Sequence, residues 1–190
     1  MLFSGSGFPP VEPFQTMFNI VVLLIAIWMV CFWTILHQAA PIGRKIFTQA
    51  SLAMIVIFAT LTSINRYVGL TVVRQSISSG NMDGLQWFLP YGWPSVMFAL
   101  EFLAWGLFFG LACLCLAPVF MTSKLEHFIF WTLIITGVLS LFAALGQVIG
   151  SSALTFNLYT LAGTMAWGPG LATAAALIAV WFRKSGVTSE

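Results

Sequence analysis

The chain has 190 residues, of which 60% are hydrophobic, 15% aromatic and 6% charged, and its formal net charge is +2. A soluble domain carries about 25% charged residues, so this composition excludes an ordinary soluble enzyme and a disordered chain. It also excludes a nucleic-acid binder, which needs clustered basic residues. Three cysteines are too few for a disulfide scaffold or a four-cysteine zinc site. The sequence therefore predicts an all-α, polytopic integral membrane protein surrounded by the lipid bilayer.

Five apolar stretches are long enough to cross a membrane as helices. A transmembrane helix needs about 20 mostly apolar residues to span roughly 30 Å of hydrocarbon. The stretches are uniformly apolar, whereas the strands of a transmembrane barrel alternate polar and apolar residues. In chain order the predicted spans are residues 17–36, 46–73, 95–117, 128–148 and 159–182. Together they form a bundle of five transmembrane helices in a single domain, residues 1–190.

Basic residues predict the orientation of the bundle, because short loops rich in Lys and Arg stay in the cytoplasm. In a five-span chain three loop or terminal positions fall on one side, and they hold Arg44 with Lys45, Lys124, and Arg183 with Lys184. Arg74 is the only basic residue near the opposite side. We predict that the N-terminus is outside and the C-terminus cytoplasmic, in the cell membrane of a bacterium or archaeon.

The second and third spans each contain a charge, Arg66 and Glu101. A charge in hydrocarbon costs at least a few kcal/mol, so each is a candidate functional residue. If the second helix begins near residue 46, Arg66 reaches the interface. If it begins near residue 53, Arg66 lies about 10 Å deep, level with Glu101. The run from Tyr67 to Ile77 has no helix breaker except Gly69, which favours a long helix and the deeper position.

An Arg66–Glu101 pair would neutralise both charges, provided that further hydrogen bonds satisfy the remaining polar atoms. Other polar or aromatic residues are expected at the same level or above it, in the outer half of the bundle. The predicted ligand-binding residues are Arg66, Glu101, Asn65, Gln147, Arg74 and Trp93. The predicted function is binding or transport of a small molecule or lipid through this polar cluster. The alternative is a structural ion pair in a non-catalytic, accessory subunit of a membrane complex or homo-oligomer.

The sequence contains none of the common catalytic motifs, such as HExxH, GxSxG or a P-loop. We therefore predict no catalytic residue, although a lipid-directed enzyme that uses Glu101 and Arg66 is a third hypothesis. His37 and His127 end the first span and begin the fourth, where paired histidines could hold haem or a metal. Neither lies inside a span, so we predict no metal site and no cofactor.

Two patterns concern helix packing. Residues 106–110 and 146–150 both fit GxxxG, which allows helix backbones to approach closely. In the fifth span, Pro169 removes a backbone hydrogen bond and is flanked by Gly168 and Gly170. The sequence therefore predicts a bend there, acting either as a hinge or as a static kink.

Overall fold

The computed structural model describes residues 12–89, 95–149 and 153–185, and within these ranges it contains helices and their connections but no strand. The α-helices are α1 (Phe14–Ala39), α2 (Lys45–Val68), α3 (Arg74–Ser79), α4 (Val96–Phe102), α5 (Phe109–Leu116), α6 (Lys124–Ile149), α7 (Ala153–Met165) and α8 (Leu171–Ser185). The π-helices are η2 (Gly69–Val73), η4 (Leu103–Phe108) and η6 (Ala166–Gly170). The 3₁₀ helices are η1 (Ile42–Arg44), η3 (Leu85–Trp87) and η5 (Ala117–Val119).

Several of these elements join end to end, so that the described chain has five helices long and apolar enough to cross a membrane. They are Phe14–Ala39, Ile42–Ser79, Val96–Val119, Lys124–Ile149 and Asn157–Lys184. For the described residues, the prediction of an all-helical fold with five helices long and apolar enough to span a membrane is confirmed. The second is the longest, with 38 residues. It continues past Arg66 to Gly80, whose left-handed conformation (φ 71°) ends the helix as glycine commonly does.

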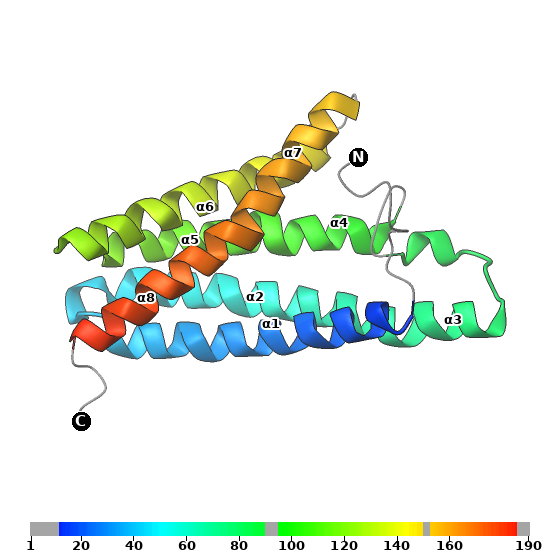
Figure 1. Ribbon diagram of the computed structural model, residues 1–190, viewed down its shortest axis with the longest axis horizontal. Coiled ribbons are helices and arrows are strands. Elements are labelled where there is room, and N and C mark those ends of the chain that lie inside the picture. Colours follow the sequence, from blue (N-terminus) through cyan, green and yellow to red (C-terminus); the bar gives the residue numbers. More distant parts are fainter. Residues whose placement is uncertain (1–11, 90–94, 150–152, 186–190) are drawn as a thin grey trace.

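The helices pack in chain order (Figure 1). α1 lies beside α2, α4 and α5 lie along α2, and α6 lies along α5. The last long helix, α7 to α8, contacts α6 and crosses the others obliquely. Short connections join α1 to α2 and α5 to α6, which makes these neighbours antiparallel.

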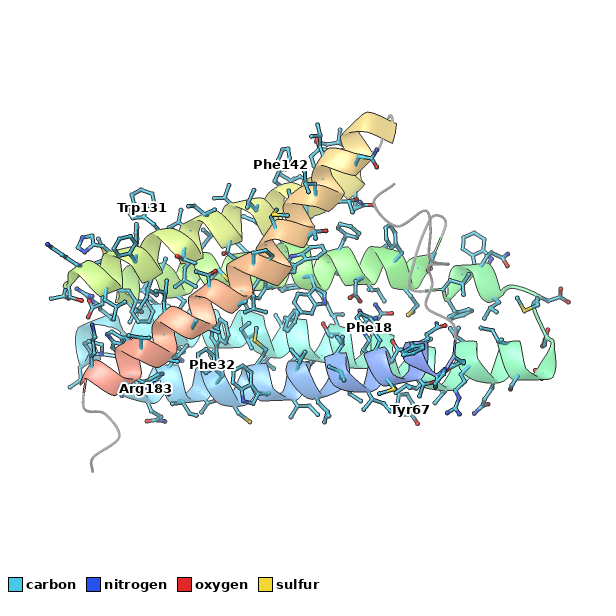
Figure 2. All side chains as sticks on the ribbon, in the orientation of Figure 1. Phe18, Phe32, Tyr67, Trp131, Phe142 and Arg183 are labelled. Carbon is cyan, nitrogen blue, oxygen red and sulfur yellow. The ribbon has the colours of Figure 1, made fainter. Side chains whose placement is uncertain are left out.

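The centre of the bundle is apolar and aromatic. Phe58 of α2 packs edge-on against Trp105, with ring centroids 4.7 Å apart, and Phe109 lies 5.9 Å from Phe58. The outside of the bundle is apolar as well. Figure 2 shows Trp131 of α6 pointing away from the other helices, and this side chain is 58% exposed. Phe142 packs against Tyr159 of α7 and is still 45% exposed. Large apolar side chains on the outside suit a hydrocarbon environment better than water.

Hydrogen bonds hold the helices together at the end of the bundle that contains the η1 and η5 turns. We call this the Arg44 end. Arg44 Nη1 donates to the carbonyl oxygen of Val119 at 2.6 Å. Further along, Ser51 Oγ accepts from Trp33 Nε1 at 2.7 Å and donates to the Ala112 carbonyl at 2.6 Å. These bonds join α1, α2 and α5 and satisfy polar groups that have no access to water.

Glycines allow close contact between α5 and α6. A Cβ atom on Gly137 would lie 2.9 Å from the carbonyl oxygen of Gly110, and one on Gly106 would lie 2.6 Å from Ala144 Cβ. The first GxxxG motif therefore packs against α6 of the same chain. In the second, Gly146 faces Tyr159 of α7, and residue 150 lies outside the described residues.

The fifth spanning helix contains Pro169 within the π-helix η6, at the position where a bend is predicted. Beside it, Trp167 Nε1 donates to the Trp105 carbonyl at 3.0 Å and to Ser140 Oγ at 3.2 Å. Trp105 belongs to the π-helix η4, so one indole links two π-helices to α6. π-Helical turns occur often at functional sites.

We expect the substitution Trp167→Phe to lower the free energy of unfolding by about 1 kcal/mol, because it removes this donor and keeps most of the ring contacts. The measurement is reversible unfolding in mild detergent. Trp131→Phe serves as the control, since Trp131 is 58% exposed and no hydrogen bond of its indole is among those described. Equal losses in the two variants would show that the Trp167 hydrogen bonds contribute nothing.

Candidate functional site

The two charges within the long apolar helices form a salt bridge. Arg66 comes from the last turn of α2 and Glu101 from α4, and Arg66 Nη2 contacts Glu101 Oε1. The Arg66 side chain is 3% exposed and that of Glu101 is 17% exposed. The neighbouring Tyr67 points away from the bundle (Figure 2) and is 64% exposed. The helical rotation between residues 66 and 67 thus turns the charge inward and the phenol outward.

Asn65 of α2 supports the pair from the same helix. Its Nδ2 atom donates to the Met97 carbonyl at 3.1 Å and to Glu101 Oε2. Glu101 is therefore held by two neighbouring residues of α2. Three of the predicted site residues, Arg66, Glu101 and Asn65, are brought together in this way.

Helix α1 supplies two partners that the sequence analysis missed. Asn19 Oδ1 lies 3.5 Å from Arg66 Nη1, and the Phe18 ring centroid lies 5.3 Å from Arg66 Cζ. A signal for Asn19 existed in the pattern of the first span. The buried face of α1 consists of Gln15, Asn19, Val22, Ala26, Met29, Trp33 and Leu36, alternately three and four residues apart. An amide within an apolar stripe of that period faces the interior.

Four buried polar atoms next to the ion pair have no hydrogen-bond partner in the structure: Thr62 Oγ1, Asn65 Oδ1, Arg66 Nε and Trp105 Nε1. Thr62, Asn65 and Arg66 share one face of α2, because residues three and four apart are neighbours on a helix. Trp105 lies one turn after Glu101, beside its carboxylate, without forming a hydrogen bond of good geometry. We call Asn19, Thr62, Asn65, Arg66, Glu101 and Trp105 the polar cluster.

A buried polar atom without a partner costs about 1–3 kcal/mol. Four such atoms around one ion pair are therefore an expensive arrangement for a purely structural contact. Arg66 Nε and Trp105 Nε1 are donors, Asn65 Oδ1 is an acceptor, and the Thr62 hydroxyl can act as either. The polar cluster can bind a small group that both donates and accepts hydrogen bonds.

The structure places the remaining predicted site residues elsewhere. Gln147 lies near the end of α6 and lines a groove between α6 and the α4–α5 helix. Arg74 is exposed at the start of α3, beyond the π-helix η2, whose extra residue per turn shifts the helical register after Arg66. Trp93 lies outside the described residues. Gln147 and Arg74 are thus not seen to join the salt bridge.

Both histidines bond to nearby oxygens. His37 Nδ1 lies 2.8 Å from Thr48 Oγ1, and His127 Nδ1 lies 2.9 Å from the Ser123 carbonyl oxygen. Within the part of the chain that the structure describes, no group of three His, Cys, Asp or Glu residues is placed to hold a metal ion. Neither histidine adds a polar contact to the polar cluster.

Most of the free space in the structure lies on the outside of the bundle. An interior space beside Trp33 and Phe109 has a volume of about 10 Å³. Larger grooves run between α1 and α2 (about 490 Å³) and between α4–α5 and α6 (about 690 Å³). Neither Arg66 nor Glu101 lines any of these three spaces. A ligand at the polar cluster must therefore present a small group.

Comparisons with protein-family models, with curated proteins and with solved structures found no match to this chain. Its function therefore has to be inferred from its own residues and their geometry.

Proposed function

We propose that this chain is a multi-pass membrane protein that binds a small neutral molecule, or the neutral head of a lipid, at the polar cluster. The observation that supports this most strongly is the group of four buried polar atoms without partners around an ion pair that is already neutral. Transport of the same molecule would require the polar cluster to open to both sides of the membrane in turn.

The proposal includes the orientation of the bundle in the membrane. Arg44 contacts the end of the α5 helix at Val119, and Lys124 begins α6. Lys184 lines the same groove as Lys124, and Arg183 lies at that end of the molecule in Figure 2. The basic residues thus gather at the Arg44 end, as a cytoplasmic face requires. The Arg66–Glu101 pair then lies in the outer half, with the N-terminus outside.

The chemistry of the polar cluster favours an uncharged ligand. Arg66 and Glu101 neutralise each other, so a net charge on the ligand would be buried without a counter-charge, which is costly in hydrocarbon. A hydroxyl or amide group can accept from Arg66 Nε or Trp105 Nε1 and donate to Asn65 Oδ1. An alcohol with an apolar tail, such as a monoacylglycerol, combines this head with access through the bilayer.

Binding of a radiolabelled monoacylglycerol to the protein in phosphatidylcholine nanodiscs tests this proposal. We expect saturable binding by the wild type. Thr62→Val should weaken it about fivefold to tenfold, the equivalent of one lost hydrogen bond. Glu101→Gln should weaken it further, because it leaves the Arg66 charge uncompensated beside the ligand.

Thr60→Val is the matched control for Thr62→Val, since Thr60 lies on the exposed side of the same helix and bonds only to the Val56 carbonyl among the described contacts. The control should bind like the wild type. Equal binding by the Thr60 and Thr62 variants, or a wild type without saturable binding, would contradict the proposed function.

The second candidate is the structural or accessory subunit. It is favoured by the fact that the pair and its partners join α1, α2 and α4, as a lock between helices does. If this is the function, the wild type binds monoacylglycerol only at background level. Glu101→Gln then lowers stability and leaves that binding unchanged.

A further inference from the structure

A second ligand site is suggested by the groove between the α4–α5 helix and α6. Its volume of about 690 Å³ falls within the range of about 300–1,000 Å³ that is usual for small-molecule sites. Leu103, Leu107 and Leu111 line one wall, and Leu141 and Leu145 line the other. Ala99 also lines it, and its small side chain leaves room beside the leucines.

The groove runs lengthwise along the two helices that line it. Along the α4–α5 helix it extends from Val96 to Leu111, sixteen residues that span roughly 22 Å at a rise of 1.5 Å per residue. One leaflet of the hydrocarbon core is about half of 30 Å thick. The groove therefore covers the depth of a leaflet and runs along the helices, as an extended hydrocarbon chain in a bilayer does.

The lining has one polar side chain, Gln147, on the α6 wall. Gln147 is two residues before the end of α6, and its Nε2 atom is buried without a hydrogen-bond partner. The contact of Gly106 with Ala144 puts Gln147 level with Leu103 of the facing helix. This level lies in the half of the bundle that also holds Arg66 and Glu101. The lining is thus apolar except for Gln147, which lies near the end of the α6 wall and whose Nε2 atom has no hydrogen-bond partner.

We propose that this groove binds the acyl chain of a membrane lipid, with the Gln147 amide bonded to the ester group of that lipid. The hydrocarbon chain of such a lipid matches the apolar lining, and its ester carbonyl can accept a hydrogen bond from the Gln147 amide. A helix of a second copy fits less well, because close helix association uses small residues such as glycine. The glycines near this groove, Gly106 and Gly110, already pack against α6 of the same chain.

The lipid site stands apart from the proposed function. It uses the face of the α4–α5 helix that carries Leu100 and Leu103, whereas Glu101 faces α2. Loss of monoacylglycerol binding at the polar cluster therefore leaves the acyl-chain site unaffected, and the two proposals fail separately.

Photolabelling tests the acyl-chain site on the full chain. The protein is reconstituted in phosphatidylcholine vesicles containing phosphatidylethanolamine with a diazirine in its acyl chain, irradiated, and digested for peptide mapping. We expect the label to concentrate on residues 96–111 and 141–148. Gln147→Met, which removes the amide and keeps the length of the side chain, should lower this labelling about fivefold, the equivalent of one lost hydrogen bond.

Ala99→Phe should block the groove and abolish the concentrated label. Its matched control is Ala53→Phe, which adds the same ring at an exposed alanine of α2 that does not line this groove. Uniform labelling of all five long helices would overturn the proposal. Equal effects of the two phenylalanine variants would overturn it as well.

Discussion

Replacing Glu101 by alanine is expected to lower the free energy of unfolding by about 3–5 kcal/mol, because it leaves a buried arginine without its counter-charge. Arg66 is 3% exposed, and its other described contacts are Asn19 Oδ1 at 3.5 Å and the ring of Phe18. Neither of these neutralises a full charge. Reversible unfolding in mild detergent, followed by tryptophan fluorescence, measures the loss.

The double variant Arg66→Met with Glu101→Met separates an unpaired charge from a general packing defect. Removing both charges together is expected to restore most of the lost stability, since apolar residues of similar volume replace buried ion pairs with little cost. Asp83→Ala, at an exposed loop position, should change stability by less than about 0.5 kcal/mol. A double variant as unstable as Glu101→Ala would contradict the ion-pair interpretation.

Gly137→Ala is expected to lower the free energy of unfolding by about 2 kcal/mol, because overpacking outweighs the better helix propensity of alanine. The added Cβ would lie 2.9 Å from the Gly110 carbonyl oxygen and 2.7 Å from Leu114 Cγ. Leu114 can change its side-chain rotamer, but the backbone of Gly110 moves only if α5 and α6 separate. The loss is measured by the same unfolding experiment.

Gly43→Ala makes the same substitution where no atom lies within 4 Å of the added Cβ. We expect this control to unfold like the wild type. If Gly137→Ala is as stable as Gly43→Ala, the close approach of α5 and α6 at Gly110 is not a feature of the folded protein.

The five long helices and the continuous second helix are predictable because hydropathy and the absence of helix breakers are local properties. The predicted ends fall one to six residues inside the observed ones, except at the start of the third span, which is predicted one residue too early. Hydropathy marks the apolar centre of a helix, whereas the helix itself continues into polar residues such as Gln75 and Ser76 before Gly80 ends it.

The salt bridge is predictable from energetics, since two opposite charges in apolar helices at the same depth are far more stable when paired. Its partners on α1 follow less directly. Asn19 lies in a span without charge, and its role depends on which face of α1 packs against α2. That choice is made by tertiary contacts.

The position of Gln147 could not be predicted from its depth in the membrane alone. The rise of 1.5 Å per residue gives the level of a side chain in the membrane, but its direction depends on the rotation of the whole helix. The π-helices η2 and η4 add a residue to a turn and shift this rotation within the second and third spanning helices. The sequence gives no simple signal for such turns, so Arg74 could not be placed relative to Arg66. The direction of Gln147 depends on the rotation of α6, which tertiary contacts decide.

Cysteine accessibility tests most directly whether the helices cross a membrane with the Arg66–Glu101 pair in its outer half. In a variant without Cys31, Cys113 and Cys115, single cysteines are placed at the exposed positions Asn81 and Thr122, which flank the third long helix. A membrane-impermeant maleimide should label position 81 in intact cells and position 122 only after permeabilisation. Labelling of both positions from the same side, or of position 122 alone in intact cells, would contradict the account.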